Sequence, residues 1–141
     1  MEADRDSRDV TKLQDLVLTS ALTGQPLPGT GTIMVPELAQ IVARERVFVL
    51  DENLSPSIAR HIGSKSLVIV DRSQLAQPAG TGGDIMYLSF GPVELRGDLA
   101  LVRLDVSVQG TIGSRSLGGA VFEFERTQGQ WVAKPPNTFA T

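Results

Sequence analysis

The feature that most constrains this chain is the alternation of apolar and polar residues through its last third, from Asp84 to Lys134. Between Asp98 and Val108, apolar side chains occupy every second position. Because successive side chains of a strand point to opposite faces, this spacing predicts a strand with one face in the core. Similar runs bounded by turn-forming residues occur at 86–95, 120–125 and 131–133. The pattern predicts four antiparallel strands joined by short loops, a β-meander.

The first of these runs contains an interruption at Gly91-Pro92. Before it the apolar positions are even (Met86, Leu88, Phe90), and after it they are odd (Val93, Leu95). One face can stay inward across such a change only if the strand bulges or bends there. A longer loop is expected at 109–116.

The first half of the chain reads as helices and two short strands. Ser7 can cap an amphipathic helix over 8–22, which Gly24 ends as a glycine just beyond a helix C-terminus. Ser55 and Pro56 are a typical helix start, and Gly63 suits the end of that short helix. The remaining predicted elements are a helix from Pro36 to about Glu45, strands at 47–50 and 67–70, and one helical turn within 72–77.

Length and composition favour one folded α+β domain. With 141 residues the chain can bury roughly 70% of its unfolded surface. We expect N-terminal helices packed on a curved C-terminal antiparallel meander, with residues 1–6 as a disordered tail. The charged start of the chain and the lack of an apolar run of about 18 residues predict a cytoplasmic protein without a membrane span. A net charge of −3 argues against nucleic-acid binding.

Several chemistries are excluded by residue content. The chain has no cysteine and one histidine, His61, so thiol nucleophiles, disulfides and Cys- or multi-His zinc sites are ruled out within one chain. A Mg²⁺ or Ca²⁺ site built from carboxylates alone is left open by this content, but no oxygen ligands with the spacing of a calcium loop support one. The glycine-rich segments 29–32 and 80–83 lack the residues that make a phosphate-binding loop, so turn chemistry explains them better. We therefore expect neither a metal nor a cofactor.

Three residues remain as candidates for catalysis: His61, Tyr87 and Asp51. His61 falls in the last turn of the predicted 56–62 helix, where the helix dipole favours its charged form, and this capping role is the simpler explanation. Asp51 begins the polar run Asp51-Glu52-Asn53 at the end of a predicted strand, a common place for functional loops. Solvation of the loop and capping of the next helix explain that run equally well.

Two functional hypotheses follow. The leading one is a non-catalytic binding or interaction module, which takes a small apolar ligand in a pocket between helices and sheet, or a protein. The alternative is a small acid–base enzyme, a hydrolase or isomerase, in which a pocket carboxylate acts with His61 or Tyr87.

The sequence also predicts self-association. Leu99, Leu101 and Val121 lie on the face of their strands that carries the polar residues, and exposed apolar patches usually mark interaction sites. We expect a two-fold homodimer that buries this face. The competing explanation is that a terminal segment or the 109–116 loop covers it within one chain.

The segments Gly118–Arg126 and Gly129–Val132 carry a resemblance. A Gly-Gly that opens a strand, an aromatic ladder and a closing Gly-x-Trp-x-Val resemble the final hairpin of many small uncharacterised bacterial α+β proteins. The order of helix first and strands last is similar to the nuclear transport factor 2-like, or cystatin-like, cone fold. The chain also resembles the compact proteins carried on mobile gene cassettes. The cone fold hosts enzymes and binding modules alike, so the resemblance implies a fold and leaves both functional hypotheses open.

Overall fold

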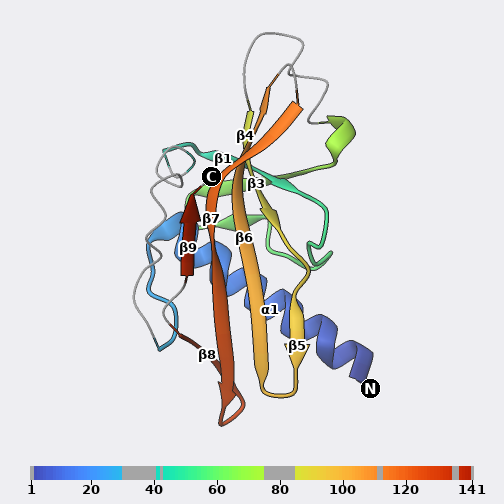
Figure 1. Cartoon of the computed structure of the whole chain (residues 1–141), viewed down its shortest axis with the longest axis vertical. Helices are drawn as coiled ribbons and strands as arrows, with labels where there is room; N and C mark the ends of the chain where they lie inside the picture. The colour runs from blue at the N-terminus through green and yellow to red at the C-terminus, as the bar shows by residue number, and fades with distance from the viewer. Residues whose placement is uncertain are drawn as a thin grey trace.

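The computed structural model describes residues 2–29, 41, 43–74, 85–110, 113–134 and 137–140. Within these residues, one long helix packs on a large mixed sheet, so the protein is α+β (Figure 1). The predicted helix at 36–45 lies largely outside the described residues. The elements are α1 (Glu2–Thr23), β1 (Arg46–Leu50), β2 (His61–Ile62), β3 (Lys65–Val70), β4 (Ile85–Phe90), β5 (Glu94–Arg96), β6 (Leu99–Gly110), β7 (Gly113–Thr127), β8 (Gln130–Ala133) and β9 (Asn137–Ala140).

The sheet joins a parallel part to an antiparallel part. Its strand order is β2-β3-β1-β4-β6-β7-β8, with β5 paired to β6 and β9 paired to β7. β1 is parallel to both β3 and β4. All other pairs are antiparallel: β2–β3, β4–β6, β5–β6, β6–β7, β7–β8 and β7–β9. Each predicted C-terminal run contains a strand. These strands are antiparallel neighbours in the order β4-β6-β7-β8, and they belong to one mixed sheet, because β4 also pairs with β1.

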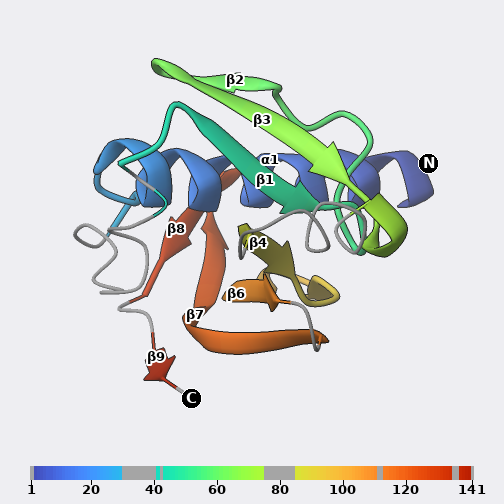
Figure 2. The same cartoon turned by 90° about the horizontal axis from the view of Figure 1, so that it is seen from above.

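The helix α1 lies along one face of this sheet. In the view from above, β1 and β3 cross the axis of α1 at a slant (Figure 2). Its end at Gly24 is confirmed: Gly24 has a φ of 78°, and its N–H donates to the carbonyl of Ser20 at 3.0 Å. The helix starts earlier than predicted, because residues 2–6 are helical where a disordered tail was expected. The apolar stripe of α1 is fully buried and consists of Leu13, Val17, Leu18, Ala21 and Leu22.

Opposite α1, the sheet contributes one continuous set of core side chains. They come from every second position of β1, β4, β6, β7 and β8, as the alternation predicted. The fully or almost fully buried members are Val47, Val49, Leu88, Phe90, Val102, Leu104, Val106, Phe122, Phe124 and Trp131. No helix in the described part of the chain is both long and apolar enough to cross a membrane.

The change of parity at Gly91-Pro92 has the predicted structural consequence. Phe90 pairs with Leu104 and Leu95 with Ala100, so five steps along the chain through Gly91 match four steps along β6. The extra residue lets Phe90 and Leu95 face the same core. The predicted loop at 109–116 is wrong in extent, because β6 runs to Gly110 and β7 starts at Gly113.

The predicted helix at 56–62 is also wrong. Ser55 caps only one turn: its Oγ accepts from the N–H of Ser57 and its carbonyl from the N–H of Ile58, both at 3.2 Å. The chain then enters β2, and Gly63, with a φ of 61°, sits in the tight turn between β2 and β3. The Ser-Pro start and the glycine stop are local signals that a single turn and a hairpin satisfy equally well.

The strands of the parallel part are apolar on both faces. Leu67 and Ile69 of β3 belong to the core beneath α1, whereas Val68 and Val70 point to the opposite face. There they join a second apolar cluster, which also contains Phe48, Leu50, Ile85 and Tyr87. This two-sided environment explains why the 67–70 run is continuously apolar, as predicted for a buried strand.

The segment after α1 closes the outer edge of β8. The N–H of Ala133 donates to the carbonyl of Pro28 at 2.6 Å. Gly29 follows with a φ of 88°, and a Cβ added there would collide with Cγ1 of Val132. Only glycine combines this backbone conformation with so close an approach to a neighbouring strand.

Candidate functional site

An open groove of about 720 Å³ lies between the first half of α1 and the loop that follows β1. The helix side is formed by Ser7, Arg8, Val10, Thr11, Lys12 and Asp15, and the loop side by Asn53, Leu54, Ser55, Pro56 and Ser57. We call it the helix–loop groove. Its volume falls in the range of sites for small molecules, about 300–1,000 Å³.

The loop side of the groove is held in place by one buried side chain, Gln14 of α1. Its Nε2 donates to the carbonyl of Asn53 at 2.7 Å, and its Oε1 accepts from the N–H of Ser55 at 2.8 Å. The amide thereby satisfies a backbone acceptor and a backbone donor of the loop, as a neighbouring strand would. Gln14 has no exposed surface, its bond to Ser55 is buried and its bond to Asn53 is partly buried, so the two bonds hold the loop on the helix.

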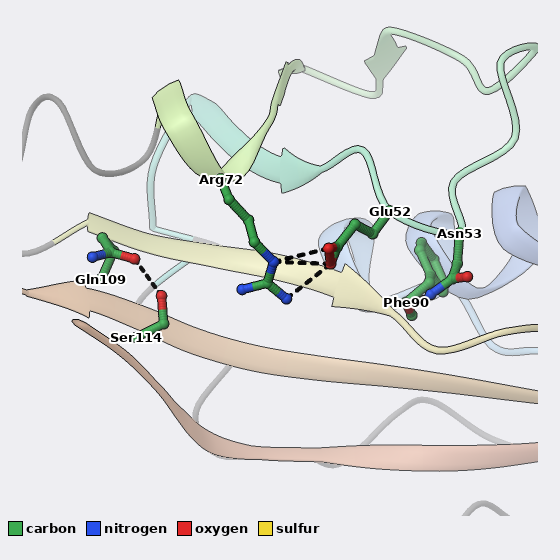
Figure 3. A network of polar contacts seen from close by, with 6 residues as sticks. All are labelled: Glu52, Asn53, Arg72, Phe90, Gln109 and Ser114. Atoms are coloured by element: carbon green, nitrogen blue, oxygen red, sulfur yellow. Dashed lines mark hydrogen bonds and ion pairs between the residues drawn. The ribbon is translucent and has the colours of Figure 1, made fainter.

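Asn53 connects the same loop to the sheet. Its φ of 59° lies in the left-handed region that asparagine tolerates better than most residues. Its Nδ2 donates to the carbonyl of Phe90, the last residue of β4, at 3.0 Å (Figure 3). The groove is therefore built on three elements that are far apart in sequence: α1, the loop after β1, and β4.

Two further contacts tie the walls of the groove together. Thr11 and Ser55 share a hydrogen bond between their hydroxyl groups. Asp15 Oδ1 accepts from the N–H of Ala59 at 3.4 Å. Burial raises the pKa of the Asp15 carboxyl above its ordinary value of 3.8, although the bond from Ala59 and the nearby charge of Lys12 act in the opposite direction.

The groove combines apolar and polar surface. Val10 and Leu54 are half-buried and offer hydrocarbon contact beside Pro56, while hydroxyl groups lie on both walls. Arg8 and Lys12 stand one helical turn apart and are exposed on the helix side, so both cations face the same opening. A ligand with an apolar body and an anionic group matches this arrangement.

Next to the groove, polar residues gather beyond the carboxyl ends of the parallel strands β1 and β3. Arg72 binds Glu52 through two nitrogens, with Nε to Oε1 and Nη2 to Oε2 both at 2.8 Å (Figure 3). These hydrogen bonds lower the pKa of Glu52. Both side chains are largely exposed, so the pair joins two loops without forming a desolvated centre.

The structure does not bring His61 and Tyr87 together. His61 is exposed on β2, with Nδ1 3.4 Å from Oγ of Ser66, and it lies in a strand where the sequence predicted a helix end. Tyr87 is buried on β4 in the second apolar cluster. β3 and β1 lie between β2 and β4, a separation of three strand spacings or about 14 Å. Asp51 is exposed just beyond β1, and none of the three lines the helix–loop groove.

No group of three or more His, Cys, Asp or Glu side chains capable of holding a metal ion occurs in the described ranges. The residues that organise the groove, above all Gln14, did not emerge from the sequence as site residues. A signal was present nonetheless. Gln14 is a polar residue within the apolar stripe of α1, four positions after Val10 and four before Leu18. A polar side chain on a buried helix face needs a partner, and here the partner is the loop.

The sheet face that was predicted to form a dimer carries two exposed leucines. Leu99 and Leu101 of β6 retain 43% and 38% of their accessible surface, whereas Val121 is half-buried. Together with Glu94, Arg96 and Glu123, these leucines line a small hollow of about 140 Å³. Polar residues are usual on such a face, so the two large exposed apolar side chains are exceptions there.

Comparisons with models of protein families, with curated proteins and with solved structures find no match to this chain. The resemblance to the cone fold therefore stays a prediction, and function has to be argued from the geometry of the molecule.

Proposed function

We propose that this protein is a non-catalytic binding module whose ligand lies in the helix–loop groove. The observation that carries the proposal is the Gln14 clamp, which holds the loop wall of an open groove rigidly against the helix wall. A preformed groove loses little conformational entropy when it binds, and this favours affinity. Catalysis needs an acid or base beside a second reacting group, whereas His61 lies three strand spacings from Tyr87, and neither these two residues nor Asp51 lines the groove.

The residues on the two walls of the groove indicate the class of ligand. An apolar body would contact Val10, Leu54 and Pro56, and an acidic group would approach Arg8 and Lys12. This differs from the pocket between helix and sheet that the sequence suggested, because the hollow lies between α1 and a loop.

A thermal-shift screen with a small-molecule library tests this proposal. A compound that binds only the native state at 100 times its Kd adds about 2.7 kcal/mol to the free energy of unfolding and raises the Tm by several degrees. We expect hits to be apolar carboxylates or phosphates, and their uncharged amides or esters to be weaker.

Two variants with matched controls locate the site. Ser57→Trp fills the groove and should abolish the shift, whereas Ser64→Trp, in the exposed turn after β2, should leave it unchanged. Arg8→Gln should weaken the binding of acidic ligands, and Arg46→Gln, which removes an exposed cation at the start of β1, should not. A library without any stabilising compound, or hits that tolerate Ser57→Trp, would contradict the proposal.

A second observation favours self-association. We propose that the exposed face around Leu99, Leu101 and Val121 is buried in a homodimer. Sedimentation at micromolar concentration tests this assembly: a monomer would refute it. If a dimer forms, Leu101→Glu should separate it, because a charge would then enter an apolar contact.

A further inference from the structure

We infer that the two chains of the dimer are related by a two-fold axis running along β6, so that Arg96 of one chain faces Glu125 of the other. This inference rests on the homodimer proposed above and goes beyond it by fixing the symmetry axis and the residues that face one another.

Arg96 of β5 and Glu125 of β7 flank the same residue. Arg96 pairs with Leu99 across the β5–β6 ladder, and Glu125 pairs with Leu99 across the β6–β7 ladder. The three side chains therefore form one row across the sheet, with a positive charge, an exposed leucine and a negative charge in that order. All three are exposed, and the side chain of Arg96 keeps 81% of its surface.

This row is complementary to itself. A two-fold axis that runs along β6, midway between two packed sheets, exchanges the β5 side of one chain with the β7 side of the other. Leu99 then meets Leu99 of the partner subunit, and Arg96 meets the opposite charge of Glu125 on both sides. Packed sheets lie about 10 Å apart, a gap that a long arginine and a glutamate can span together.

In the next row along β6, the same axis brings two glutamates together, and each has a cation of its own chain nearby. Glu94 pairs with Leu101, and Leu101 pairs with Glu123, so this row would place Glu94 against Glu123. Lys134 Nζ lies 3.8 Å from Oε1 of Glu123 and offsets its charge. Leu101 meets its own copy in this row, which extends the apolar contact started by Leu99.

The test uses charge reversal in purified full-length chains, with sedimentation at low salt as the readout. Arg96→Glu places two like-charged pairs in its own dimer, and so does Glu125→Arg. Each variant alone should weaken dimerisation by at least about tenfold, because like charges are forced together across the interface. Circular dichroism should show both variants folded, since the altered side chains are exposed.

An equimolar mixture of the two variants is the decisive sample. In a mixed dimer, each reversed side chain faces a reversed partner, and each original side chain faces an original one, so both pairs attract. Dimers should therefore reappear in the mixture, and also in the double variant Arg96→Glu/Glu125→Arg. No rearrangement within one chain can produce the rescue by mixing.

The outcomes separate this inference from the proposed dimer. If the wild-type protein is a monomer, both the proposed dimer and the proposed axis are refuted. Suppose that the wild-type protein is a dimer, that Leu101→Glu separates it, and that the charge reversals do not change its affinity. The proposed dimer would then be supported, and the proposed axis would be refuted. Rescue of Arg96→Glu by Glu94→Arg in place of Glu125→Arg would also overturn it, because that result indicates an axis across the strands.

Discussion

Asp9 and Arg126 lie 117 positions apart in the sequence, yet Asp9 Oδ2 accepts a hydrogen bond from Nη1 of Arg126 at 3.1 Å. The other carboxylate oxygen of Asp9 accepts from Nε1 of Trp131 at 3.3 Å. The guanidinium of Arg126 also stacks on the Trp131 ring, 4.7 Å from its centre. These contacts tie the first half of α1 to the hairpin formed by β7 and β8.

Removal of Asp9 should be costly because the ion pair is mostly buried, with 18% and 16% of the two side chains exposed. Asp9→Ala leaves Trp131 without its acceptor and Arg126 with Asp98 as its remaining carboxylate partner, and should lower the free energy of unfolding by about 2 to 3 kcal/mol. Asp98→Ala is the control: its side chain is 72% exposed, and its loss should cost at most about 1 kcal/mol. Urea denaturation followed by circular dichroism measures both, and equal losses would contradict the expectation.

Gly29→Ala should destabilise the protein by about 2 to 4 kcal/mol, because it adds a collision with Val132 to a left-handed backbone. Gly129→Ala is a matched control with a similar φ of 78° and no atom near the added Cβ, and about 1 kcal/mol is expected there. Adding Val132→Ala to Gly29→Ala should recover part of the loss in a double-mutant cycle. If the two glycine variants lose the same stability, the collision is not the cause.

Gln14→Leu keeps a similar volume but leaves the carbonyl of Asn53 and the N–H of Ser55 without their partner. We expect a loss of about 2 to 3 kcal/mol in thermal or urea unfolding, since the bond of the Ser55 N–H is buried and that of the Asn53 carbonyl is partly buried. Hydrogen exchange should show faster exchange for the N–H of Ser55. Gln25→Leu, at an exposed position, should change stability by less than about 0.5 kcal/mol. Unchanged protection of Ser55 would show that the clamp does not hold the loop.

The pKa of Asp15 predicts a pH dependence of stability. Burial raises this pKa in the folded protein, so the native state holds the proton to a higher pH than the unfolded chain does. The contribution of Asp15 is therefore most favourable below its ordinary pKa of 3.8, declines as the pH rises towards the folded value, and stays constant above it. Asp15→Asn should remove this decline, so the variant gains stability relative to wild type between pH 3 and pH 7. A difference that is flat or of opposite sign over this range would contradict the prediction.

The antiparallel strands could be predicted from the sequence because the pattern that indicates them is local. Alternation places Val102, Leu104 and Val106 in the core whichever strands lie beside them. The parity change at Gly91-Pro92 likewise needs no knowledge of β6, since an extra residue is the only way to keep both halves facing inward.

The parallel part of the sheet and the helix–loop groove could not be predicted in the same way. The pairing of β1 with β3 and β4 depends on contacts between segments remote in sequence, for which the chain carries no local signal. Ser55, Pro56 and Gly63 suit a helix as well as they suit a turn followed by a hairpin, and only burial of Ile58 and Ile62 in the core decides between them. The groove was missed for the same reason, because Gln14 acquires its role only when the loop reaches α1.

The bond between Pro28 and Ala133 has a consequence for how copies of this protein meet. A bare strand edge can recruit strands from other molecules without limit, which is how sheets grow into fibrils. Along β8, the carbonyl of Pro28 already occupies this edge, and the contact of Gly29 with Val132 leaves little room for an incoming backbone. Strand addition at this end of β8 is therefore blocked, which disfavours open-ended growth of the sheet from this edge.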